Sequence, residues 1–215
     1  QKPAGTLTAA VNGSQTAWQV SDASLVGVGS LISAEGERAI VTGRTAVSTG
    51  QTLTSDMEVY DSDRELVVAD GTQIHPGERI TVDTERMLVL SVTGNVVLVQ
   101  RAYEGSTLQA HLTGATVYAD RLLTVERAAR GTTAASHAQG TALTVWEVPE
   151  LVRALCRAEA ITRLEQEFSA YGSRVFSDEA ERDASGTEVV SGRGLTDIRK
   201  SCARRYKRKF RKRAI

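Results

Sequence analysis

The sequence predicts an α+β protein, in which an antiparallel β region of the sandwich or barrel type (residues 1–146) precedes a pair of C-terminal helices (residues 147–215). Short alternating segments, separated by Gly and Asn turn residues, fill the first part. A motif of 26 residues is written twice in tandem there. Helical spacing of apolar residues begins only after Pro149. No apolar run approaches the roughly 20 residues that cross a membrane, so we expect no membrane partner.

The strands of the β region follow from alternation and turn chemistry. Asn12-Gly13 and Gly94-Asn95 are typical turn pairs between alternating segments. The expected strands ahead of the tandem motif are, in chain order, 7–11, 16–20, 31–33, 38–42 (ending at Gly43), 53–60, 65–69, 79–82 and 87–92. Their shortness and regular spacing favour a sandwich or a small barrel.

The tandem motif repeats residue types at matched offsets. The first copy contains Arg101, Ala102, Gly105, Thr107, His111 and Gly114, and the second contains Arg127, Ala128, Gly131, Thr133, His137 and Gly140. An apolar run (96–99 or 122–125) precedes each copy, and an alternating stretch (115–118 or 141–145) follows it. The motif therefore predicts a repeated strand–loop–strand unit. A weaker duplication relates residues 20–43 to 68–94 and includes Glu37 and Glu85.

Two helices are expected in the C-terminal part. Pro149 and Glu150 suit a first helical turn, and apolar residues then recur at helical spacing up to Gly172. A second helix is predicted from Leu195, with one apolar stripe formed by Leu195, Ile198, Cys202, Tyr206 and Phe210. The acidic, glycine-containing stretch 173–194 between them is expected to be a loop.

The zero net charge conceals a strong asymmetry. Ten Lys or Arg residues lie between Arg199 and Arg213, which leaves 16 basic against 26 acidic residues in the remainder. The two parts are therefore expected to face different neighbours. Cys156 and Cys202 lie far apart in helical patterns. Both are predicted to be buried free thiols, as in a protein made in a reducing cytoplasm.

The sequence does not predict an active site. His111 and His137 occupy equivalent places, but neither has a Cys or carboxylate at ligand spacing. An imidazole that bonds the loop backbone in each repeat explains this duplication better than metal binding or catalysis. Residues 130–133 lack the ending of a phosphate-binding loop. We therefore expect no enzyme activity, no catalytic residue, no cofactor and no metal.

The basic second helix is the strongest functional signal. Its apolar stripe is interleaved with the cations Arg204, Arg205, Lys207, Arg208 and Lys209. Such a helix can bind nucleic-acid phosphates, dock into the groove of a partner protein, or simply be solvated. The regular stripe favours protein docking, because phosphate binding alone requires no apolar face.

The β motifs resemble a module widespread in virion proteins of tailed bacteriophages. The resemblance covers residues 16–22, Leu31-Ile32, Glu37, residues 41–43 and the tandem motif, best from Arg127 to Gly140. In that family a duplicated β unit ends in Arg-Gly-x-x-Gly-Thr-x-Ala-Ala-x-His-x-x-Gly. This chain has Ala128 where the family often has Gly, and its copy at 101–114 is looser.

The helical part is similar to the head–tail connector (adaptor or neck) proteins of long-tailed phages. Val148-Pro149 opens the first helix and Gly194-Leu195-Thr196-Asp197 opens the basic second helix in the manner of that family. The resemblance implies a structural protein of the virion neck, made in the host bacterial cytoplasm and assembled as a ring, usually of twelve copies. Its partners would be the portal protein and the downstream neck and tail proteins, and DNA would pass through the channel without specific binding.

The resemblance also implies roles for residues of this chain. The helix core would be Leu151, Leu155, Leu164 and Phe168. The portal-docking residues would be Leu195, Ile198, Cys202, Arg204, Arg205, Tyr206, Lys207, Arg208, Lys209 and Phe210. A tail, baseplate or fibre protein, and a DNA-binding protein that uses the basic segment, remain alternatives. A hydrolase fits least.

Overall fold

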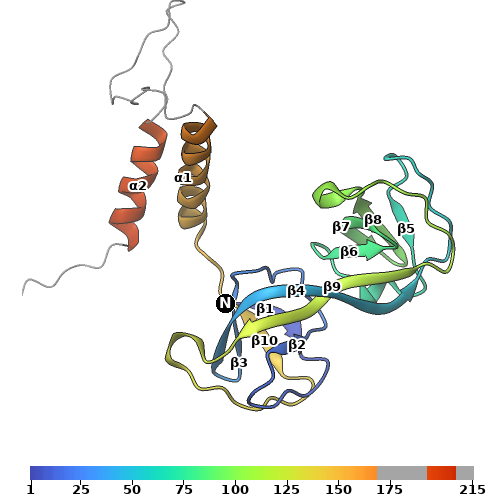
Figure 1. Cartoon of the computed structure of the whole chain (residues 1–215), viewed down its shortest axis with the longest axis horizontal. Coiled ribbons are helices and arrows are strands. Elements are labelled where there is room, and N and C mark those ends of the chain that lie inside the picture. The colour runs from blue at the N-terminus through green and yellow to red at the C-terminus, as the bar shows by residue number, and fades with distance from the viewer. Residues whose placement is uncertain (169–192, 207–215) are drawn as a thin grey trace, which may run out of the picture. The chain divides into compact units, whose positions relative to one another are not determined.

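The computed structural model describes residues 1–168 and 193–206, and the chain forms two compact units, Gln1–Glu147 and Val148–Ile215. Within the described residues, the first unit contains ten antiparallel-paired strands and the second contains two helices (Figure 1). The predicted α+β class, with a β region followed by helices, is confirmed.

The ten strands form one hydrogen-bonded sheet. They are β1 (Lys2–Thr6), β2 (Ala17–Gln19), β3 (Leu31–Ala34), β4 (Glu37–Thr52), β5 (Glu65–Val67), β6 (Arg79–Val82), β7 (Glu85–Thr93), β8 (Val96–Gln100), β9 (Thr116–Glu126) and β10 (Ala142–Val145). Their order in the sheet is β1-β10-β3-β4-β9-β6-β7-β8-β5, and β2 also pairs with β9.

The sheet is built from two β modules that share its two longest strands. The first module consists of β1–β3, the start of β4, the end of β9, and β10. The second consists of the end of β4, β5–β8, and the start of β9. The pairing of Trp18 with Leu123 in the first module corresponds to that of Leu66 with Val97 in the second. The duplicated sequence is therefore a duplicated structure.

Each module has its own apolar core. The core of the first surrounds Trp18, whose side chain is fully buried, and includes Leu7, Ile32, Leu123 and Leu143. The core of the second is formed by residues such as Leu66, Ile80, Met87 and Val97. Burial of side chains of this size contributes about 1.5–3 kcal/mol each, so each module is stabilised from within.

Two expected strands, 7–11 and 53–60, were wrong. Leu7 and Val11 form single bridges to Val20 and His137, and Leu53 and Met57 do the same with Val68 and His111. Each apolar residue thus pairs with a different segment, so the alternation marks core-filling positions and not one continuous strand. Strand β1, with the sequence KPAGT, was not expected because it has no apolar alternation.

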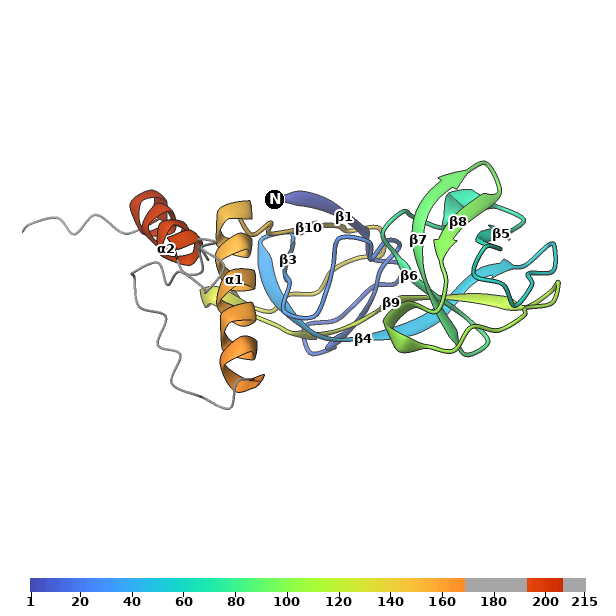
Figure 2. The same ribbon diagram turned by 90° about the horizontal axis from the view of Figure 1, so that it is seen from above.

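The long strands also differ from expectation. The strand predicted at 38–42 does not end at Gly43 but continues as β4 to Thr52. The segments predicted at 115–118 and 122–125 join into the single strand β9. The two strands pair antiparallel from Ile40↔Glu126 to Thr52↔Thr116, with three register irregularities that absorb the bend between modules. Both strands run from one module to the other (Figure 2).

A buried ion pair joins the modules beside this ladder. Arg121 in β9 donates Nε and Nη2 to Glu78, at 2.8 and 2.6 Å. Glu78 also accepts the backbone N–H of Ala23, from the first module, and that of His75. The backbone N–H of Glu78 also donates to the carbonyl of His75 and closes a turn there. The pair therefore fixes one module against the other.

The helices are α1 (Glu150–Phe168) and α2 (Arg193–Tyr206). Helix α1 begins where Pro149 and Glu150 predicted it, whereas α2 begins two residues before the expected Leu195. The predicted continuation of α1 to Gly172 lies outside the described residues, and so do residues 173–192 of the loop predicted at 173–194. The last two residues of that loop, Arg193 and Gly194, belong to α2. Among the described helices, none is long and apolar enough to cross a membrane.

Candidate functional site

In the described part of the helical unit, α1 and α2 are antiparallel and two polar contacts join them. Near the start of α1, the Cys202 thiol donates to the carbonyl of Leu151 at 3.3 Å. Further along α1, Arg199 of α2 donates Nε and Nη2 to the Glu159 carboxylate at 2.6 and 2.7 Å. This hydrogen bonding lowers the pKa of Glu159 and raises that of Arg199. Both side chains are solvated, so the pair orients α2 more than it stabilises it.

The structure separates the predicted docking residues into three groups. Leu195 and Ile198 are half-buried, and Cys202 is buried against α1 of the same chain. Arg204, Arg205 and Tyr206 are exposed on the last turn of α2. Lys207, Arg208, Lys209 and Phe210 lie outside the described residues. The part of the stripe that α1 leaves open for a partner is therefore at the C-terminal end of α2.

Two sequence predictions about α1 were wrong. Leu164, expected in the helix core, is 52% exposed, and Cys156, expected to be buried, is exposed. The half-buried face runs through Leu151, Leu155, Ala158 and Thr162. Leu164 lies off this face, because residues three or four apart share a helix face and Leu164 is two positions after Thr162. Both cysteines are free thiols as predicted, and the side chain of Phe168 is outside the described part.

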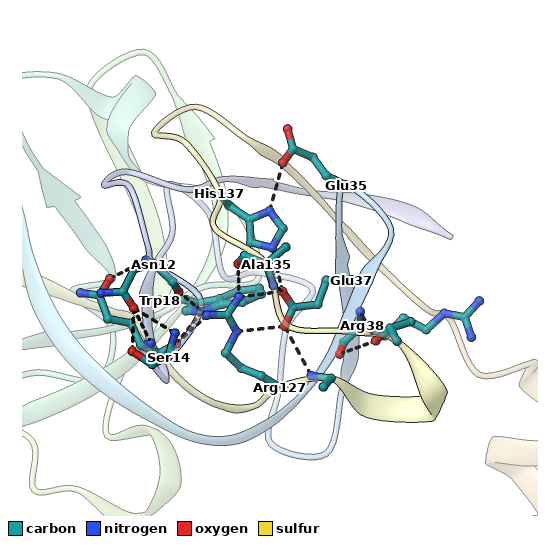
Figure 3. Close-up of polar contacts among 12 residues, drawn as sticks. Asn12, Ser14, Trp18, Glu35, Glu37, Arg38, Arg127, Ala135 and His137 are labelled. Carbon is teal, nitrogen blue, oxygen red and sulfur yellow. Dashed lines mark hydrogen bonds and ion pairs between the residues drawn. The ribbon is translucent and has the colours of Figure 1, made fainter.

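The tandem motif builds a buried polar network in the first module (Figure 3). The Glu37 carboxylate accepts Nε and Nη2 of Arg127 at 2.9 and 2.6 Å, and faces Nε2 of His137 at 2.9 Å. It also accepts the backbone N–H of Ala135 at 3.0 Å. Arg127 donates further to the carbonyls of Asn12, Gln15 and Ala135. The network thus closes the loop that follows β9.

The second module contains the same network. The Glu85 carboxylate accepts Nε and Nη2 of Arg101 at 2.8 and 2.9 Å, and faces Nε2 of His111 at 3.0 Å. It accepts the backbone N–H of Gln109 at 3.0 Å, and Arg101 donates to the carbonyls of Glu58, Asp63 and Gln109. The repeated Arg and His therefore make equivalent contacts with a buried Glu in both modules.

The buried histidines contact carboxylates, and not the loop backbone that was predicted. Nδ1 of His137 faces Glu35 at 3.0 Å, and Nδ1 of His111 faces Asp83 at 2.7 Å. Each ring thus lies between two carboxylates, whereas we expected it to bond the loop backbone. Glu37 and His137 are 100 residues apart, so no local spacing reveals the pair. The one sequence signal that pointed to these carboxylates was the appearance of Glu37 and Glu85 at matching places in the weaker duplication.

The two central carboxylates are held ionised. Burial raises the pKa of Glu37 and of Glu85, but hydrogen bonds from Arg, His and two backbone N–H groups outweigh it and lower each to about 2. In the described part of the chain, no buried side-chain polar atom lacks a partner. No cluster that could hold a metal occurs there either. The network is thus internally saturated, as a structural clamp requires.

Each motif loop contains two non-glycine residues in the left-handed backbone region. Ala102 and Glu104 have φ of 49° and 53°, and Ala128 and Arg130 have φ of 55° and 56°. This conformation costs a residue with a Cβ atom about 1–2 kcal/mol, whereas Gly adopts it without strain.

Replacing Ala128 with Gly is therefore expected to raise the free energy of unfolding by about 1 kcal/mol, measured by urea denaturation. Ala142→Gly is the matched control, because Ala142 is exposed in the ordinary strand β10 and Gly there should be destabilising. If Ala128→Gly destabilised the protein as much as the control, the strain assignment would be wrong.

Comparisons with protein-family models, curated proteins and solved structures find no match to this chain. Function is therefore inferred from the geometry of the two units.

Proposed function

We propose that this protein is a structural component of a tailed-phage virion, a head–tail adaptor that forms a ring and docks on the portal through α2. The observation that carries the proposal is the last turn of α2. Arg204, Arg205 and the 44%-exposed Tyr206 are displayed there, while Cys202 and Arg199 tie the preceding turns to α1. A cationic, partly aromatic helix end on a braced helix pair suits insertion into an acidic protein groove.

The first unit, Gln1–Glu147, here called the β unit, supports a scaffolding role. It carries 16 acidic and 10 basic residues, a net charge of −6, and its buried polar groups are engaged in internal clamps. An anionic surface repels DNA and so suits a channel that DNA must traverse without binding. Two modules sharing β4 and β9 provide a stiff body of this kind.

The test reverses the charge of the helix end. In the full chain, Arg204→Glu with Arg205→Glu and Tyr206→Ser should leave the circular dichroism spectrum unchanged, because all three side chains are exposed. Supplied in trans during particle assembly, this variant should be lost from purified particles, at least tenfold below the unmodified chain. Lys2→Glu with Arg64→Glu, two exposed cations of the β unit, is the control and should be incorporated normally. Normal incorporation of the α2 variant would overturn docking by this helix end.

The runner-up functions give different results. A DNA-binding protein would retain filter-bound DNA with a steep salt dependence that disappears when residues 199–215 are removed. A baseplate or fibre protein would form trimers or hexamers by native mass spectrometry, whereas an adaptor ring would be close to twelvefold. The cationic end of α2 is shared by the DNA-binding alternative, and the exposed aromatic ring of Tyr206 beside these cations favours docking on a protein.

A further inference from the structure

The two modules differ in the loop that the buried arginine of each one holds. In the first module, Arg127 donates Nη1 to the carbonyls of Asn12 and Gln15. Residues 13 and 14 alone separate these two contacts. The carboxamide oxygen of Asn12 accepts the N–H and the hydroxyl of Ser14, at 2.9 Å each (Figure 3). The loop of the first module is thus short, closed on itself and without charged side chains.

The corresponding loop of the second module is longer. Arg101 donates Nη1 to the carbonyls of Glu58 and Asp63, at 3.0 and 2.9 Å. Four residues, 59–62, therefore lie between the equivalent contacts. The Asp63 carboxylate accepts the backbone N–H of Glu58 at 2.6 Å, and the N–H of Asp63 donates to the carbonyl of Tyr60 at 3.0 Å. The buried network of this module thus holds the longer loop at both ends.

The extra length of this loop displays two large apolar side chains. Val59 is 48% exposed and Tyr60 is 64% exposed. The first module folds with Gly13 and Ser14 at this place, so the fold itself does not require the apolar pair. Exposed aromatic side chains that are held in place by their own fold are typical of protein-binding surfaces, because little conformational freedom is lost on docking.

The longer loop is also anionic. Residues 58–65 have a net charge of −3, since they contain the cation Arg64 and four acids, Glu58, Asp61, Asp63 and Glu65. Arg64 pairs with Asp61 at 2.6 Å. The carboxylates of Glu58 and Glu65 are exposed and have no ion-pair partner among the described residues. A partner for this surface must therefore supply positive charge.

We infer that the 58–65 loop, centred on Val59 and Tyr60, is a docking surface for a basic protein other than this chain. DNA is anionic, and so is the β unit of a second copy, with its net charge of −6, so the loop repels both. The cationic end of α2 from a second copy has the required charge. The choice of a foreign protein over that helix end rests on the proposed function, which assigns it to the portal.

The test is photo-crosslinking from position 60. Tyr60 is replaced in the full chain by the photoreactive aromatic analogue p-benzoylphenylalanine, and the chain is supplied in trans during particle assembly. Cross-links are mapped by mass spectrometry in the assembling cells, before particles are purified. We expect attachment to a foreign protein, within a segment that has an excess of Lys and Arg. The same analogue at Ser14, in the loop of the first module, is the matched control and should give about tenfold less product or lower.

Charge reversal tests the chemistry of the contact. In the chain with the analogue at position 60, Glu58→Lys with Glu65→Lys should lower the cross-link yield about tenfold or more. The melting temperature should not change, because both carboxylates are exposed and unpaired in the described part of the chain. Glu126→Lys, at an exposed acid of the first module, is the control and should keep the yield. An undiminished yield in the double variant would contradict docking through the anionic loop.

The remaining outcomes separate this docking surface from the proposed function. Cross-links to DNA or to a second copy of this chain, or a yield no higher than that from Ser14, would each overturn the docking surface. If the chain still enters particles in those cases, the adaptor function is unaffected. If position 60 cross-links to a basic foreign protein but purified particles lack the chain, the docking surface stands and the adaptor function fails.

Discussion

Replacing Glu85 with Gln is expected to lower the free energy of unfolding by about 3–5 kcal/mol, because it leaves Arg101 as a buried cation without a counter-charge. The side chains of both residues are fully buried, so water cannot solvate the orphaned guanidinium. The same change also removes the carboxylate that faces His111 and the N–H of Gln109. For a domain whose total stability is typically 5–15 kcal/mol, this is a large fraction.

The measurement is urea denaturation of the full chain followed by circular dichroism. Glu65→Gln is the matched control, since Glu65 is exposed on β5 and should change stability by less than about 0.5 kcal/mol. Glu37→Gln should act on the first module as Glu85→Gln acts on the second, and there the buried Trp18 reports unfolding by fluorescence. A loss below 1 kcal/mol in both variants would show that the networks do not clamp the modules.

Acid should destabilise the β unit strongly between about pH 4.5 and pH 2. The pKa of Glu37 and of Glu85 is about 2 in the folded protein, against an ordinary value of 4.5. A carboxylate with a lowered folded-state pKa stabilises the fold fully above its ordinary value, and this contribution disappears as the pH falls toward the folded-state value. The difference corresponds to about 3 kcal/mol for each carboxylate.

The check is a series of urea denaturations from pH 6 to pH 2. The unmodified chain should lose stability progressively below pH 4.5, and each single variant, Glu37→Gln or Glu85→Gln, should lose less over the same range. The difference in slope between the unmodified chain and a single variant reports the replaced carboxylate, since every other acid is common to both proteins. Parallel slopes would mean that other groups govern acid unfolding.

The sequence predicted much of the fold because most of its signals are local. Alternation located β3 and β6, helical spacing with Pro149 located the start of α1, and the tandem motif announced a duplicated unit. The errors arose where a pattern had a non-local cause. Leu7, Val11, Leu53 and Met57 alternate because each fills a core from a crossing segment. The lengths of β4 and β9 follow from their mutual pairing, which neither strand's own sequence specifies.

The candidate sites show the same division. The cations and stripe of α2 were visible in the sequence, but the packing of Cys202 against Leu151 decides that only the helix end is open to a partner.

By itself, the sequence determined the α+β class, the duplication, the position of the first helix and the charge asymmetry, because periodicity, turn chemistry and composition act over a few residues. Only the tertiary structure decided that each repeated Arg and His closes on a distant Glu in a buried clamp. The physical reason is that a buried charge needs a counter-charge close to it in space. That counter-charge can come from any position in the sequence, however distant.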